Sequence, residues 1–215
     1  MNLILMKPVM PNILDQLKKL KALADTGLVY ATDGYNRERY AEILHISLEL
    51  MAQTSGNSME DLNAMFKPVT DYPTVKTDVR ALVLSPDKKQ ILMARESVDG
   101  KWTLPGGWAD IGDTPSEAVV KEVQEETGIT AKPVALLAVF DKRMHPHPPQ
   151  PFYIYKLVIL CEPVSGALKS GFDMTGAAYF DIDNLPELSE DRIVKNQIDL
   201  VYKKALANDF IAYFD

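Results

Sequence analysis

Residues 106–129 read GGWADIGDTPSEAVVKEVQEETGI, and the second half of this stretch has the start and stop signals of one helix. Thr114 suits the N-cap, Pro115 suits the first helical position, and Glu117 stands three residues after the cap. Gly128 supplies the C-terminal stop. The pattern therefore predicts a helix of about thirteen residues, a length typical of globular proteins.

Three glutamates share one face of this predicted helix, since Glu122, Glu125 and Glu126 are spaced i, i+3, i+4. Such a run is often only a solvated acidic face. A hard divalent cation would relieve the repulsion between the carboxylates, and Mg²⁺ commonly uses a few carboxylates together with phosphate oxygens. The loop before the helix favours the second interpretation, because glycine lets a ligand approach the backbone closely. Its glycines are Gly106, Gly107 and Gly112.

The stretch resembles the Nudix box, G-x5-E-x7-R-E-U-x-E-E-x-G-U, in which U is an aliphatic residue. The matching positions are Gly107, Glu122, Val123, Glu125, Glu126, Gly128 and Ile129. Two positions differ, since Asp113 stands where the family usually has Glu and Lys121 where it has Arg. Lysine lacks the bidentate fork with which arginine holds a glutamate. The resemblance covers about residues 74–208 and implies a mixed β-sheet between helices, with the box as a loop–helix–loop.

The resemblance also implies an activity, namely metal-dependent hydrolysis of a pyrophosphate bridge. Glu122, Glu125 and Glu126 would then be catalytic residues and ligands of Mg²⁺, with Mn²⁺ as a substitute. Glu122 and Glu126 are the usual metal ligands of the family, and Glu125 either binds metal or helps to deprotonate water. Lys121 is the fourth catalytic candidate, as a group that pairs with the carboxylates and fixes their rotamers. The alternative for Lys121 is a solvent-facing lysine.

The region before the box is expected to be helical. Amphipathic or capped patterns cover residues 11–26, 37–54 and 58–66, and Gly27 is expected to end the first helix. The segment GLVYATDGYNRERYAEIL resembles a helical domain that precedes the Nudix domain in bacterial hydrolases such as CDP-choline and ADP-ribose pyrophosphatases. That resemblance implies a homodimer. We divide the chain into a helical domain (1–67), a linker (68–75) and a Nudix domain (76–215).

The region after the linker changes to strand patterns. Strands are expected at 79–85, 90–96 and 177–182 and in PVALLAVFDKR and FYIYKLVILCEPV, and a final helix is expected at about 191–207. The fold class is therefore α/β or, more broadly, α+β, preceded by a small all-helical domain.

Six residues outside the glutamates are candidates for substrate binding: Arg95, Gly107, Trp108, Arg143, His145 and His147. A guanidinium suits a diphosphate, although a strand-end arginine can also be a plain surface residue. Trp102 and Trp108 could stack on a base or could simply pack. The two histidines lie in RMHPHPPQP, where the absence of a third N or S ligand argues against structural zinc. This loop either contacts substrate or is a surface loop, and His45 is interpreted as structural.

Composition narrows the class of partner and compartment. The net charge of −7 disfavours contact with a nucleic-acid backbone. No apolar run approaches the length of about 20 residues that a membrane helix needs. The start MNLILMKPVMPN lacks a basic leader and a cleavage site, so we expect no signal peptide. The single cysteine, Cys161, suits a reducing cytoplasm.

The sequence thus indicates a cytoplasmic Nudix pyrophosphatase acting on a nucleoside diphosphate derivative, with ADP-ribose and CDP-choline as leading substrates. A triphosphate-cleansing pyrophosphatase is a second candidate within the same chemistry. A nucleotide-sensing Nudix-fold protein without turnover is an alternative from a different class, although it would be expected to lose box glutamates. A helical interaction module with an acidic helix is the third class.

Overall fold

The structure is a computed structural model, and it describes residues 12–215. The apolar start of the chain and the first part of the expected helical domain, residues 1–11, lie outside the described residues. The chain forms two compact units. One comprises the described residues up to Val75 together with Pro149–Tyr153, and the other comprises Lys76–Pro148 with Ile154–Asp215. We call them the helical unit and the sheet unit.

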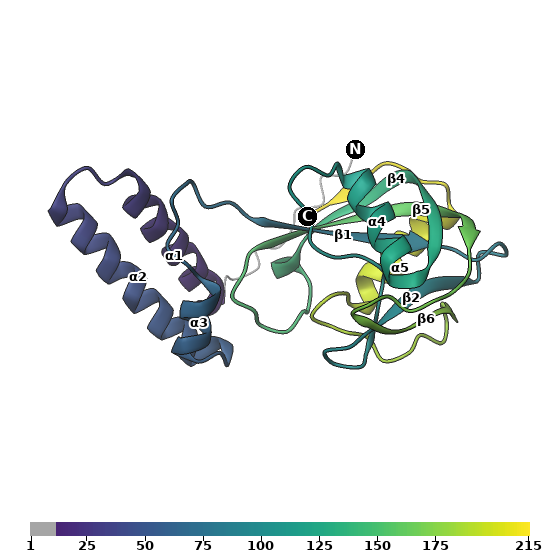
Figure 1. Cartoon of the computed structure of the whole chain (residues 1–215), viewed down its shortest axis with the longest axis horizontal. Coiled ribbons are helices and arrows are strands. Elements are labelled where there is room, and N and C mark those ends of the chain that lie inside the picture. Colours follow the sequence, from purple (N-terminus) through teal and green to yellow (C-terminus); the bar gives the residue numbers. More distant parts are fainter. Residues whose placement is uncertain (1–11) are drawn as a thin grey trace, which may run out of the picture. The chain divides into compact units, whose positions relative to one another are not determined.

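The helical unit contains α1 (Ile13–Tyr30), α2 (Gly34–Ser55) and α3 (Met59–Met65). Figure 1 shows α1 and α2 as two long helices side by side, joined by a short turn. Their buried side chains, together with one from α3, form a small apolar core of Leu14, Leu17, Leu48, Met51 and Leu62. The Ser58–Asp61 capping box starts α3, and Gly56, at φ 75°, ends α2.

Gly27 corrects the sequence-based bounds of α1. It does not end the helix, which continues to Tyr30. A Cβ at Gly27 would lie 2.4 Å from the ring of Tyr40 on α2. Gly27 therefore allows α1 and α2 to approach closely and does not end α1. The sequence pattern alone does not distinguish a glycine that ends a helix from one that allows such close packing. Helix α2 begins at Gly34, earlier than expected. Asp33 is its N-cap, and the Asp33 side chain accepts a hydrogen bond from the Asn36 backbone N–H.

The sheet unit is built on a four-stranded mixed sheet with the order β1-β5-β4-β7. Its strands are β1 (Lys76–Val83), β5 (Ile154–Gly166), β4 (Ile129–Asp141) and β7 (Tyr213–Phe214). The β1–β5 and β4–β7 pairs are parallel, and β4–β5 is antiparallel. A smaller antiparallel sheet has the order β3-β2-β6, from β3 (Trp102–Thr103), β2 (Gln90–Glu96) and β6 (Met174–Asp181).

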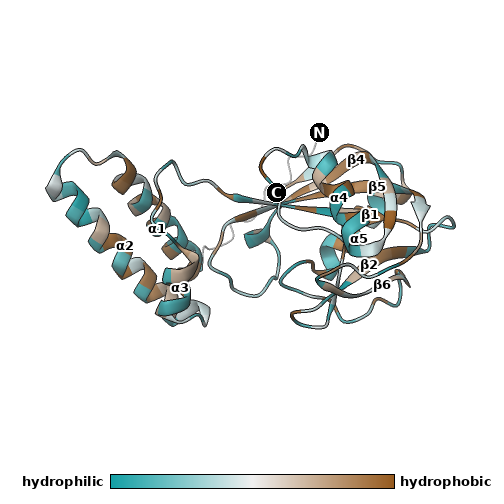
Figure 2. Ribbon diagram, viewed as in Figure 1, coloured by the Kyte–Doolittle hydropathy of each residue, from teal (hydrophilic) through white to brown (hydrophobic). Residues whose placement is uncertain are grey.

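Helices pack on both sides of the larger sheet, as expected for a mixed sheet between helices. Alternate residues of a strand point to opposite faces. Val79, Ala81 and Val83 pack with the apolar side chains of α4 (Pro115–Thr127). Leu82 and Leu84 pack instead with those of α5 (Lys195–Leu206). Figure 2 shows largely brown strands beside α4, whose ribbon carries teal segments.

The order of elements confirms the predicted fold class, while several bounds differ. The last helix starts at Lys195 rather than near residue 191, because residues 189–193 form turns that follow the bridge between Leu188 and Trp102. A short 3-10 helix, η1 (Lys142–Met144), follows β4. In the described part of the chain, no helix is both long and apolar enough to cross a membrane.

Candidate active site

Helix α4 has the caps that the sequence predicts. Thr114 accepts a hydrogen bond from the Glu117 backbone, and the Glu117 side chain accepts one from the Thr114 backbone at 2.9 Å. Pro115 occupies the first turn, and Gly128 ends the helix at φ 73° after thirteen residues. Its apolar side packs on the sheet. The remaining side of the helix presents Glu122 and Glu126 to the glycine-rich loop.

The loop before α4 is fixed by backbone pairing with β1. Val79 N donates to Gly107 O at 2.9 Å, and Ala109 N donates to Thr77 O at 3.0 Å. Gly106 has φ 145°, and a Cβ there would lie 2.0 Å from Val79 O. Only glycine therefore fits at this position, which brings the loop directly against the edge of the sheet.

Glu126 is the most deeply buried of the three glutamates, with 4% of its surface exposed. Its Oε2 accepts a hydrogen bond from Gly106 N at 2.9 Å. Burial raises the pKa of Glu126 to about 8, although Arg80 and the Gly106 hydrogen bond both favour the charged form. Such a carboxyl group is poised to be ionised by a cation that replaces its proton.

Glu122 lies beside Gly107 and is half-buried. A Cβ on Gly107 would lie 2.6 Å from Glu122 Oε1, so the glycine leaves the space that this carboxylate occupies. Burial raises the pKa of Glu122, and the negative charges of Glu125 and Asp173 add to that effect. The box glycine and the first box glutamate are thus in direct contact.

Arg80 supplies positive charge to these glutamates, and the sequence analysis did not single it out. It is buried in β1, where its guanidinium pairs with Asp78 through Nε–Oδ1 at 2.8 Å and donates to Leu104 O at 3.1 Å. Its charge opposes the rise in the pKa of both Glu122 and Glu126. Lys156, fully buried in β5, also pairs with Asp78. The signal in the sequence that could have identified Arg80 is its position as a charged residue inside the otherwise apolar strand segment VRALVL.

Glu96 is a second acidic group that the sequence analysis missed. It ends β2, is 6% exposed and pairs with Arg192. Burial raises the pKa of Glu96, which also contributes to the raised pKa of Glu126. Asp173 acts on both Glu96 and Glu122 in the same sense. The acidic region therefore extends beyond the box helix to β2 and to the loop before β6.

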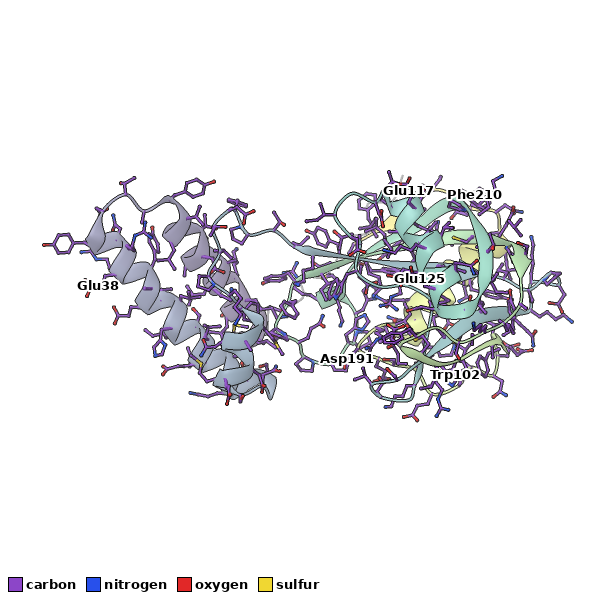
Figure 3. All side chains as sticks on the ribbon, viewed as in Figure 1. Glu38, Trp102, Glu117, Glu125, Asp191 and Phe210 are labelled. Atoms are coloured by element: carbon purple, nitrogen blue, oxygen red, sulfur yellow. The ribbon has the colours of Figure 1, made fainter. Side chains whose placement is uncertain are left out.

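Glu125 and Lys121 are exposed, unlike the other members of the box. Glu125 faces solvent from α4 (Figure 3). Lys121 pairs with Asp110 at 2.9 Å and with Asp113 at 3.8 Å, both in the loop, instead of with the glutamates. Lys121 therefore has loop acids as its ion-pair partners in this structure, and a role in holding the carboxylate rotamers stays a prediction. Lys121 tethers the loop to the helix, and Arg80 is the buried cation beside the glutamates.

Arg95 and the two tryptophans contact residues other than the box glutamates. Arg95 Nε donates to Gly100 O at 2.7 Å within the turn after β2, while its neighbour Glu96 extends the acidic region. The ring of Trp102 packs edge-on against that of Phe180, with 4.6 Å between the ring centroids. This agrees with the interpretation of Trp102 as a packing residue. Trp108 is 48% exposed, next to Gly107, with Lys76 above its ring at 5.1 Å. Trp108 therefore stays available for stacking, and the diphosphate contact of Arg95 stays a prediction.

Arg143, His145 and His147 lie in and after η1, where protein groups already bind them. Arg143 Nε donates to Asp141 Oδ2 at 2.9 Å. His145 Nε2 contacts Asp215 Oδ2 at 3.1 Å, and its ring packs on Phe140 at 4.7 Å. His147 Nδ1 contacts the carbonyl of Glu190 at 2.6 Å. The two histidines therefore order the loop in this structure, and a direct substrate contact stays a prediction for each.

The donor set suits a hard divalent cation. Within residues 12–215, no group of three or more Asp, Glu, His or Cys side chains is arranged as a preformed metal site. However, the carboxylates of Glu122 and Glu126 are oxygen donors whose raised pKa values report unfavourable charge burial. Oxygen donors of this kind are those that Mg²⁺ prefers. The residues present therefore fit such an ion.

Two family models match the chain. The NUDIX domain matches residues 75–201, and a UDP-X-like, N-terminal oligomerisation domain matches residues 11–66.

Individual proteins are similar to this chain over different shares of its length. A putative ADP-ribose pyrophosphatase, YjhB, from Bacillus subtilis is 40% identical over 88% of this chain and 90% of its own length. The crystal structure of a UDP-X diphosphatase is 34% identical, covers 93% of this chain and 96% of its own, and superposes with a TM-score of 0.62. An ADP-ribose pyrophosphatase from Streptococcus suis is 31% identical over 66% of this chain and 100% of its own, with a TM-score of 0.60.

Proposed function

Because the chain belongs to the Nudix hydrolase family, we propose that it hydrolyses the pyrophosphate bond of a nucleoside diphosphate derivative. Water attacks one phosphorus, a new P–O bond forms, and the bridging P–O bond breaks to give two phosphate-bearing products. ADP-ribose and CDP-choline are the substrates that the sequence favours. UDP-linked compounds join them, because the chain is similar along nearly its whole length to a UDP-X diphosphatase.

The observation that carries this proposal is the contact between the glycine loop and the buried glutamates. Gly106 N holds Glu126, and Gly107 leaves the space that Glu122 occupies. The retained glutamates also favour an enzyme over a sensor without turnover. We assign Glu122 and Glu126 as the residues that would hold Mg²⁺, with Mn²⁺ as a substitute. A bound divalent ion neutralises phosphate charge and acidifies water.

The protein groups have separate tasks in this proposal. Arg80 partly offsets the charge of the buried carboxylates and so favours the ionised forms of Glu122 and Glu126. Glu125, which faces solvent, accepts a proton from the attacking water. Lys121 keeps the loop at the helix through Asp110. Trp108, exposed beside Gly107, offers a ring to the substrate.

We further propose a cytoplasmic homodimer assembled through the helical unit. The matched oligomerisation domain supports self-association. Exposed apolar side chains, including Ile46 at 43% and Leu50 at 39%, stand one turn apart on α2. Light scattering of the full chain should give the mass of two copies, and the double variant Ile46→Glu with Leu50→Glu should shift it toward one. A wild-type mass of one copy would contradict the dimer.

The proposed chemistry is tested with a panel of nucleoside diphosphate derivatives in ¹⁸O-labelled water with Mg²⁺. The panel holds ADP-ribose, CDP-choline and a UDP-sugar, with a nucleoside triphosphate as the competing class. We expect a nucleoside monophosphate and a second phosphate ester, with one ¹⁸O atom in one of the two products. Binding without cleavage of every compound would favour the sensor. Preferred cleavage of the triphosphate would favour the cleansing function.

A further inference from the structure

A cavity of about 300 Å³ lies at one end of the larger sheet, and nothing above assigns it a ligand. It is lined by Val139, Asp141, Arg143, Met144, Tyr155, Phe214 and Asp215. Two of its aromatic rings reach solvent, since Tyr155 is 44% exposed and Phe214 is 73% exposed. Four of the lining side chains are apolar or aromatic and three are charged, and concave sites of this size commonly hold a small organic ligand.

The cavity lies on the face of the sheet that α4 covers. Tyr155, Leu157 and Ile159 are every second residue of β5, so their side chains share one face of the sheet. Leu157 and Ile159 pack in the apolar cluster that includes Val119 and Val123 of α4. Val139 shares this face, because it pairs with Leu157 and with Phe214. The box helix and the cavity therefore occupy the same side of one sheet.

The pairing register gives the separation between the box loop and the cavity. Ala109, two residues after Gly107, bonds to Thr77 of β1. Thr77 pairs with Tyr155 of β5, and Tyr155 pairs with Asp141 of β4. Neighbouring strands lie about 4.8 Å apart, so Tyr155 is roughly 10 Å and Asp141 roughly 14 Å from the box loop. A nucleotide with its diphosphate at the box can extend one end across this row.

The charges of the cavity select which end of a nucleotide enters. Asp141 and Asp215 both line it, and its guanidinium, Arg143, already binds Asp141. His145 in turn contacts Asp215. Two carboxylates beside one paired cation disfavour a phosphate. They suit an uncharged ring, whose N–H groups can donate to carboxylate oxygens.

We propose that this cavity, which we call the Tyr155 pocket, binds the nucleobase of the substrate between Tyr155 and Phe214. Aromatic rings that reach solvent provide stacking surfaces, and planar bases stack on them whatever their identity. Asp141 and Asp215 orient the base, and Arg143 and His145 hold those two carboxylates in place. This inference rests on the proposed function, because it takes the diphosphate to lie at the box.

The test measures kcat and KM for the preferred diphosphate with the full chain. Tyr155→Ala removes the stacking ring, and Val139→Phe fills the cavity without removing a polar group. We expect each to raise KM roughly tenfold with kcat within about twofold, the effect of losing one base–aromatic contact. Tyr155→Phe keeps the ring and should retain the wild-type KM. Phe210→Ala, at an exposed aromatic that does not line this pocket, is the matched control (Figure 3).

The outcome that overturns the proposal is a wild-type KM in either Tyr155→Ala or Val139→Phe, provided that thermal unfolding shows the variant to be folded. Should the wild type cleave no diphosphate, the proposed function fails and the pocket is tested separately by titration calorimetry with AMP, CMP and UMP. Binding of one of these, weakened roughly tenfold by Tyr155→Ala, supports the pocket. Absence of binding for all three overturns it.

Discussion

Gly106 N donates a hydrogen bond of 2.9 Å to Glu126 Oε2, across twenty residues of sequence. This bond joins the start of the glycine loop to the last turn of α4. Because Gly106 is also pressed against Val79 of β1, the buried carboxylate is positioned by the sheet as much as by its own helix. The carboxylates of the box therefore depend on backbone geometry that begins outside the box helix.

The first prediction concerns the stability of the metal-free protein when Glu126 is changed to its amide. Burial raises the pKa of Glu126 to about 8, so the group is mostly protonated at pH 7. Glu126→Gln keeps an oxygen for Gly106 N, and its melting temperature at pH 7 should stay within about 2 °C of wild type. Glu126→Leu leaves that N–H unpaired and should cost about 1–3 kcal/mol. Equal melting temperatures for the two variants would show that the bond is unimportant.

The second prediction separates two adjacent glycines. Gly106→Ala would put a Cβ 2.0 Å from a backbone oxygen at positive φ, so the sheet edge must shift. Chemical denaturation should show a loss of about 2–4 kcal/mol. Gly107→Ala meets only the flexible end of Glu122 at 2.6 Å. It should stay folded but lose Mg²⁺-dependent activity. Gly34→Ala, which meets no atom within 4 Å, is the matched control and should change neither property.

The third prediction concerns the buried pair of Asp78 and Arg80. Arg80→Met leaves Asp78 with Lys156 alone and removes the cation that acts on Glu126. Unfolding in urea should show a loss of about 3–5 kcal/mol. The triple variant Asp78→Asn, Arg80→Met and Lys156→Met removes all three buried charges and should regain part of that loss. A triple variant as unstable as the sum of the three single variants would contradict a direct coupling.

The fourth prediction is a pH dependence caused by His147. Burial lowers the pKa of His147 from 6.5 to about 4. Between about pH 4 and pH 6.5, His147 is therefore mostly protonated in the unfolded chain and mostly neutral in the folded chain. This contribution to stability is fully present above about pH 6.5 and is lost as pH falls toward 4, by on the order of 2–3 kcal/mol. His147→Asn should flatten the fall in unfolding free energy over this range. An unchanged slope would mean that other groups cause it.

The sequence predicted the box helix well because its signals are local. Thr114, Pro115 and Gly128 act within one helix, and the structure confirms the bounds that they imply. The fold class followed from the order of elements, which is also confirmed. Gly27 shows the limit of such signals, because its reason is the ring of Tyr40 on another helix.

The surroundings of the box could not be predicted in the same way, because tertiary pairing creates them. Arg80 and Glu96 come from two strands, and only the fold brings their charges to Glu126. Lys121 had the right spacing to hold a glutamate, yet the loop acid Asp110 competes for it. The Tyr155 pocket likewise depends on strand register, which the sequence pattern left open.

One comparison of rates decides whether the box glutamates drive hydrolysis of a nucleoside diphosphate derivative. Release of nucleoside monophosphate is measured with Mg²⁺ for the wild type, Glu122→Gln and Glu126→Gln on the compound that the panel selects. We predict turnover by the wild type and a loss of about 10²-fold or more in kcat for each variant. Rates equal to wild type in both variants would contradict the account.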